Sequence, residues 1–118
     1  FADDSVSMLD EIRSAYSEIL ELKSKLETAQ VLMEENQTEQ NIKNYSNLLD
    51  TFNNSGGFYF EKEYEAAIKK FGFSDEEKMR PLYEFSGGQR TKIAFLKLLL
   101  SKVSSLIKAP IFEIIIVP

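Results

Sequence analysis

Residues 85–90 have the sequence FSGGQR and run directly into an apolar stretch, TKIAFLKLLL, over residues 91–100. Ser86 is a favourable helix N-cap, because its hydroxyl can accept a hydrogen bond from an N–H group of the first turn. Gln89, three residues later, completes the S-x-x-Q pattern of a capping box. The stretch therefore predicts a capped helix start, followed by a helix over residues 91–102.

The two glycines inside this stretch favour the binding of an anion. Gly87 and Gly88 carry no Cβ atom, so a ligand can approach the backbone closely. The N–H groups at a helix N-terminus and the positive end of the helix dipole favour a phosphate group. An ordinary capped helix with a Gly-Gly loop would have the same residues, so capping alone does not decide between the two interpretations.

Residues 85–89 resemble the signature motif of the ATP-binding cassette (ABC) superfamily, L-S-G-G-Q, with Phe85 in the place of leucine. Upstream, GGFYFE at 56–61, the segment 66–73 and SDEE at 74–77 resemble, in this order, the ABC-F subgroup. The polar helical stretch 3–53 is similar to the arm that ABC-F cassettes insert before the signature. The resemblance covers roughly residues 5–102.

This resemblance implies a fragment of a soluble ABC-F ATPase that contributes the signature half of a composite ATP site. Ser86 would contact the γ-phosphate through its hydroxyl, Gly87 and Gly88 through their N–H groups, and Gln89 would buttress the loop. The ATP, with magnesium in the intact parent, would be held by a second ATP-binding cassette domain. The family also implies the ribosome as a partner, and it places no catalytic or metal-binding residue in this chain.

Two motifs that ATP hydrolysis requires do not occur where the family has them. None of the five glycines is followed by lysine, so the Walker A loop is absent. Ala109-Pro110 stands where the Asp-Glu of Walker B is expected. We therefore expect the chain alone to be catalytically silent and to bind ATP weakly at best. A truncated gene, a frameshift or an incomplete sequence would each produce this pattern.

Composition bounds the class of protein. The 118 residues carry a net charge of −5, with 43% hydrophobic and 28% charged side chains, which is typical of a soluble globular or helical protein. The absence of cysteine excludes a disulfide framework, and the absence of histidine excludes histidine-dependent hydrolases. No stretch resembles a signal peptide or a transmembrane helix, which favours a cytoplasmic location without a membrane partner.

Charge is unevenly distributed along the chain. Residues 1–59 hold 11 acidic and 4 basic side chains, which argues against broad binding of nucleic-acid phosphates by this half. Four basic residues near the signature could favour anions: Lys78, Arg80, Arg90 and Lys92. For all but Arg90, a solvated helix surface is the preferred interpretation.

The sequence predicts a mainly α fold in three parts. Residues 1–55 form an antiparallel helical hairpin, with helices over about 5–35 and 38–53 and a capping box of Asn36 and Glu39. Residues 56–102 form a small helical subdomain with the signature motif. Residues 103–118 form an atypical apolar tail, read as one short C-terminal β-strand or an aggregation liability.

Within 56–102, apolar residues at helical spacing predict a short helix that ends at Gly72: Phe60, Tyr64, Ala67, Ile68 and Phe71. Ser74 and Glu77 form another capping box. Core contacts around the signature loop are expected from Phe73, Leu82, Tyr83 and Phe85. The signature helix is apolar nearly all round, which predicts burial in a larger body and allows self-association.

Two other functions fit parts of the sequence. A nucleotide-binding subunit of a membrane ABC transporter would share the signature but usually lacks a long charged hairpin before it. An SMC-type ATPase also has a signature, but its coiled coil is far longer. A non-enzymatic helical hairpin for protein contacts would leave the Gly-Gly loop incidental.

Overall fold

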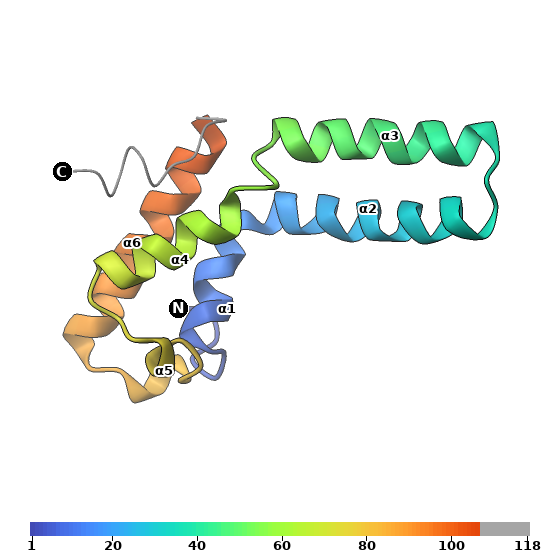
Figure 1. The fold of residues 1–118 in the computed structure, drawn as a ribbon. Coiled ribbons are helices and arrows are strands. Elements are labelled where there is room, and N and C mark those ends of the chain that lie inside the picture. Colours follow the sequence, from blue (N-terminus) through green and yellow to red (C-terminus); the bar gives the residue numbers. More distant parts are fainter. Residues whose placement is uncertain (107–118) are drawn as a thin grey trace. The chain divides into compact units, whose positions relative to one another are not determined.

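A computed structural model of the protein describes residues 1–106. These residues are mainly helical, as predicted, and the described part contains no β-strand beyond one isolated bridge between Ser7 and Pro81. The helical elements follow one another as α1 (Met8–Arg13), the 3₁₀ turn η1 (Ser14–Tyr16), α2 (Ser17–Glu35), α3 (Glu39–Asn54), α4 (Phe60–Lys70), α5 (Asp75–Lys78), the 3₁₀ turn η2 (Leu82–Glu84) and α6 (Gly87–Leu106) (Figure 1). The strand considered for the tail lies outside the described residues, whereas residues 103–106 belong to α6.

The contacts divide the chain into two compact units. One contains Phe1–Tyr16 together with Phe60–Pro118, and the other is Ser17–Tyr59. The predicted arm covers residues 1–55, whereas the contacts place residues 1–16 with the helices that follow residue 60.

The single helix predicted over about residues 5–35 is interrupted. Ser14 is the C-cap of α1, and its hydroxyl donates a hydrogen bond to the carbonyl of Glu11 at 2.6 Å. Such local side-chain bonds compete with the helical ladder. The 3₁₀ turn that follows brings the Tyr16 ring to 5.5 Å from the Phe60 ring and 5.7 Å from that of Tyr64. Aromatic packing in the first unit therefore accounts for the break.

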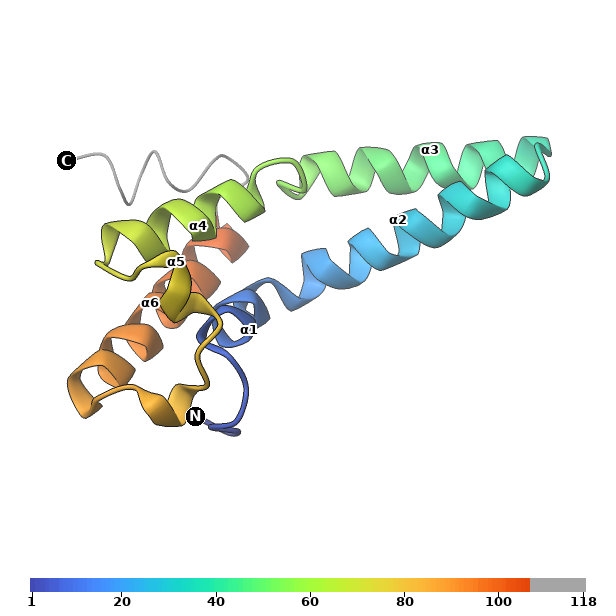
Figure 2. The same ribbon diagram turned by 60° about the horizontal axis from the view of Figure 1, so that its bottom comes forward.

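The second unit is an antiparallel hairpin of α2 and α3, which lie side by side in both views (Figures 1 and 2). Ile19, Leu26, Ala29 and Phe52 are its buried apolar residues. The predicted capping box of Asn36 and Glu39 is wrong, because Thr38 is the N-cap of α3 and accepts from the N–H of Asn41 at 3.1 Å. The Asn36 carbonyl instead accepts from the Asn41 side-chain amide at 2.8 Å.

The Gly-Gly turn after α3 uses its two glycines differently. Gly56 has φ +88°, a left-handed conformation that favours glycine. Gly57 does not have a positive φ, but a Cβ atom at this position would collide with the Phe52 ring. The predicted break therefore combines one left-handed residue with one close approach between backbone and ring.

The first unit packs around α6. Its fully buried large side chains come from several elements: Met8, Ile12, Phe60, Ile68, Leu82, Ile93, Leu96 and Leu100. Helix α4 ends in a Schellman motif, in which Phe73 N–H donates to the Ile68 carbonyl and Gly72 N–H to the Lys69 carbonyl. Gly72 has φ +91°, which confirms its predicted role at the helix end.

The predicted core around the signature is correct for three of its four aromatic and apolar members. Phe73, Leu82 and Phe85 are buried, but Tyr83 is 61% exposed. The difference arises because η2 is a single 3₁₀ turn, so that adjacent side chains point in different directions and Leu82 occupies the core position.

Helix α6 is buried on one side only. Phe95 and Leu98 are 56% and 54% exposed, whereas Ile93, Leu96 and Leu100 are fully buried. The side of α6 that carries Phe95 and Leu98 is thus left uncovered by the described residues, and burial of this helix in a larger body stays a prediction. No helix of residues 1–106 is long and apolar enough to cross a membrane.

Candidate functional site

The loop of residues 86–89 forms the predicted capping box at the start of α6. The Gln89 N–H donates to Ser86 Oγ at 3.2 Å, and the Ser86 N–H donates to Gln89 Oε1 at 3.1 Å. The Ser86 hydroxyl also donates a hydrogen bond to Gln89 Oε1 at 3.2 Å. The helical ladder begins with Arg90 N–H, which donates to the Ser86 carbonyl at 2.8 Å. The predicted capped helix start is thus present, and the Gln89 side chain contacts both the backbone and the hydroxyl of Ser86.

Two backbone donors remain available in this cap. The first four N–H groups of a helix have no partner within the helical ladder. The cap uses the N–H of Gln89, and Arg90 N–H enters the ladder, which leaves the N–H groups of Gly87 and Gly88. Ser86, Gly87 and Gly88 are exposed, so an anion can reach these donors from solvent.

The glycines themselves are not required by the chain around them. Neither Gly87 nor Gly88 has a positive φ. A Cβ atom placed on either would lie more than 4 Å from every heavy atom of residues 1–106 outside the adjoining residues and the backbone of the same helix. Gly56, Gly57 and Gly72 differ, because each meets a local requirement of backbone or packing. The surface above residues 87 and 88 is therefore open to an incoming group.

Buried residues hold the loop from behind. Phe85 directly precedes the cap in an extended conformation (φ −91°, ψ 150°) and is buried. Its ring makes an edge contact with the Phe73 ring at 6.0 Å between centroids. Leu82, in η2, is fully buried. The chain that leads into residues 86–89 is consequently held by side chains buried in the core of the first unit.

Three of the four basic residues near the loop, Lys78, Arg90 and Lys92, have hydrogen-bond or ion-pair partners within the chain. Arg90 Nη2 lies 2.9 Å from Asp4 Oδ2, and its guanidinium lies 5.6 Å from the centre of the Phe1 ring. Lys92 donates to the Phe71 carbonyl at 3.1 Å. Lys78 pairs with Glu65 and Asp75.

Hydrogen bonding to Glu65 raises the pKa of Lys78 above its ordinary value, which keeps that side chain charged. Arg90 is the basic residue for which the sequence allows a role with anions. Its guanidinium instead forms an ion pair with Asp4. The loop therefore offers neutral donors, the N–H groups and one hydroxyl, rather than a cluster of cations.

Residues 1–7 are the neighbours of the loop that sequence reasoning missed. Ser7 is the N-cap of α1 and accepts from Asp10 N–H at 3.0 Å. The S-x-x-D pattern of Ser7 and Asp10 is a signal for a helix that starts at Met8, and it would have separated this segment from the arm.

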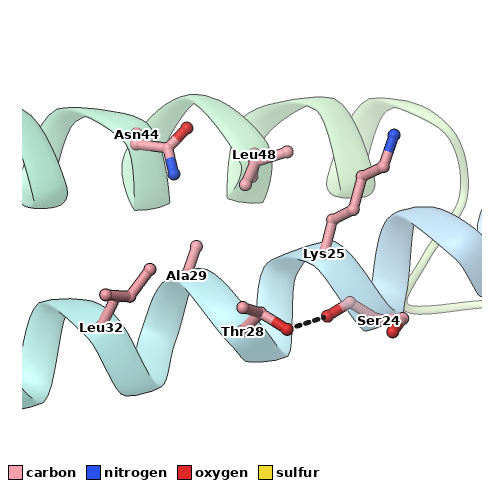
Figure 3. A pocket seen from close by; sticks show the side chains of 7 residues that line it. All are labelled: Ser24, Lys25, Thr28, Ala29, Leu32, Asn44 and Leu48. Carbon is pink, nitrogen blue, oxygen red and sulfur yellow. Dashed lines mark hydrogen bonds between the residues drawn. The ribbon is translucent and has the colours of Figure 1, made fainter.

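A shallow groove of about 400 Å³ lies between α2 and α3 in the second unit (Figure 3). It is lined by Ser24, Lys25, Thr28, Ala29, Leu32, Asn44 and Leu48. Thr28 Oγ1 donates to the Ser24 carbonyl at 3.1 Å, and Lys25 pairs with Glu21 at 3.5 Å. Lys25 is the one titratable lining residue, so the groove offers no acid–base pair.

Metal binding by clustered side chains finds no support in the described part of the chain. Residues 1–106 contain no group of three or more acidic, histidine or cysteine side chains that could hold a metal ion. The loop of residues 86–89, by contrast, presents exposed backbone donors of the kind that suit an anion.

Comparison with known proteins agrees with this chemistry at a coarse level. The chain is 33% identical over 69 residues to a Bacillus subtilis (strain 168) protein named "Putative ATP-binding protein YdiF". The match covers 58% of this chain and 11% of that protein. No protein-family model matches the chain, and no solved structure matches it. The chain is therefore similar, over more than half of its length, to a small part of a protein described as ATP-binding.

Proposed function

We propose that residues 86–89 are one half of a composite ATP site and that the chain is the helical part of an ABC-F type ATP-binding cassette. The observation that carries this proposal is the pair of glycines at a capped helix start, where neither φ nor packing requires glycine. Glycine in a helix costs about 1 kcal/mol relative to alanine. The close approach of a phosphate group to the backbone would explain why glycine occupies both position 87 and position 88.

The residues of the loop fit the phosphates of a nucleotide. The N–H groups of Gly87 and Gly88 would donate to phosphate oxygens. The Ser86 hydroxyl would donate as well, once its proton turns away from Gln89 Oε1, which now accepts it. Gln89 would continue to support the loop through the Ser86 N–H. Because the described side chains form no acidic cluster, we assign the magnesium ion that accompanies ATP to the opposite domain.

The partners follow from the same proposal. The nucleotide would be held by a second ATP-binding cassette domain, and the hairpin of α2 and α3 would be the arm through which ABC-F proteins contact the ribosome. This hairpin, Ser17–Tyr59, disfavours the transporter-subunit alternative, whose members usually lack such a segment. The exposed Phe95 and Leu98 side chains would be covered by the remainder of the cassette or by self-association.

Hydrolysis of ATP by a polypeptide that carries this chain within complete cassettes tests the proposal. Ser86→Ala and Gly88→Ala should each lower the rate by on the order of tenfold or more, because each alters a group proposed to bind the transferred phosphate. Ser74→Ala is the matched control, since Ser74 caps α5 through the same kind of bond, from Glu77 N–H at 3.3 Å. It should leave the rate unchanged.

Equal rates in all three variants would favour the non-enzymatic hairpin. The 118-residue chain alone should show no turnover, and measurable hydrolysis by it would refute the assignment of the catalytic groups to another domain.

A further inference from the structure

The segment before α1 lies along the residues that lead into the loop of residues 86–89. Three backbone hydrogen bonds join them: Met8 N–H donates to the Arg80 carbonyl at 2.9 Å, Leu82 N–H to the Val6 carbonyl at 3.0 Å and Tyr83 N–H to the Asp4 carbonyl at 3.1 Å. This pairing ends at Tyr83, three residues before Ser86. Backbone pairing alone therefore leaves the first turn of α6 unanchored to the N-terminal segment.

The side chain of Asp4 joins this segment to the first turn of α6, where the centre of the Phe1 ring also lies 5.6 Å from the Arg90 guanidinium. Its carboxylate lies 2.9 Å from the Arg90 guanidinium, while the Asp4 carbonyl holds Tyr83 on the other side of the loop. The Arg90 N–H in turn donates to the Ser86 carbonyl at 2.8 Å, which is the first bond of the α6 ladder. One residue thus contacts both the chain that enters the loop and the helix that leaves it.

We propose that Asp4 is a positioning residue that, through Arg90, orients the N–H groups of Gly87 and Gly88 toward their anion. Donor groups must be held within a few tenths of an ångström and about 10–20° to be effective. The consequence for ATP binding rests on the function proposed above, whereas the orientation of the loop by Asp4 does not depend on it.

A matched control exists in the same unit. Glu11 Oε2 and Lys97 Nζ are 2.8 Å apart and join α1 to α6, about two turns beyond Arg90. Glu11→Gln removes a carboxylate–ammonium pair that does not involve residues 86–90, although the Glu11 side chain is 12% exposed against 45% for Asp4. Asp4→Asn therefore removes an ion pair at Arg90, in the first turn of α6, whereas Glu11→Gln removes one at Lys97, two turns later.

The experiment is amide hydrogen exchange and ¹⁵N–¹H chemical shifts of the 118-residue chain, with helical content checked by circular dichroism. Asp4→Asn should shift the Gly87 and Gly88 resonances and speed exchange at Arg90 by up to about fivefold, as expected from loss of an exposed ion pair. Glu11→Gln should change neither. Asp4→Glu should restore the wild-type shifts, because it returns the carboxylate.

Unchanged Gly87 and Gly88 resonances in Asp4→Asn, or equal changes in Glu11→Gln, would overturn the inference. Failure of the proposed function would look different. In that case Ser86→Ala would not affect hydrolysis by the complete cassettes, while the Asp4→Asn shifts would still be observed.

Discussion

Replacement of Gly87 and Gly88 by alanine should stabilise this chain. Both residues lie in the first turn of α6, neither has a positive φ, and an added Cβ atom meets no neighbouring atom within 4 Å. Under these conditions, Gly→Ala stabilises a protein by about 0.4–1 kcal/mol, chiefly because the unfolded chain loses freedom. The double variant should therefore gain about 1–2 kcal/mol, if the two sites act independently.

Urea unfolding of the 118-residue chain, followed by circular dichroism at the helical band, measures this gain. For a chain of this length, 1 kcal/mol corresponds to roughly 3–6 °C in the midpoint of thermal unfolding, which gives a second measurement. The matched control is Gly72→Ala. Gly72 has φ +91°, and an alanine in the left-handed region costs about 1–2 kcal/mol.

Whether Gly87→Ala and Gly88→Ala raise or lower the stability of the chain tests the inference. A loss of stability in Gly87→Ala or Gly88→Ala comparable to that in Gly72→Ala would mean that the fold itself needs these glycines. The inference that they serve a group from outside the chain would then have no basis. A gain in stability combined with loss of ATP hydrolysis in complete cassettes is the expected result.

Three further predictions concern single side chains. Ser86→Ala should lower the free energy of unfolding by about 1 kcal/mol through loss of the N-cap bond, as seen by urea unfolding; no change would mean that the cap is not formed in solution. Tyr16→Phe should raise stability by about 1 kcal/mol, because the buried Tyr16 hydroxyl has no hydrogen-bond partner among residues 1–106; a clear loss would indicate that a partner exists. The backbone hydrogen bond from Ser74 lowers the pKa of Glu77 below its ordinary value of 4.5, so this carboxylate stabilises the fold above that value, and its contribution disappears as the pH falls through the lowered pKa. Glu77→Gln should flatten this acid dependence, and an unaltered pH profile would contradict the assignment.

Local rules predicted the features that depend on neighbours in sequence. The capping boxes at Ser74 and Ser86 and the helix end at Gly72 are present because each needs only residues three to five positions apart. The helical hairpin followed from helix periodicity and a break in it. The site loop was found in the same way, since its donors belong to a single helix start.

The sequence by itself determined the mainly α fold, the helix caps and the loop of residues 86–89, because local hydrogen bonds and side-chain spacing specify these features. Only the tertiary structure decided that residues 1–16 belong to the same unit as α4 and α6, that the Tyr16 ring packs against Phe60 where the first helix is interrupted, and that Asp4 pairs with Arg90. These contacts join residues more than forty positions apart. No local pattern specifies such pairs, because they form where apolar surfaces from distant segments meet and bring opposite charges within reach.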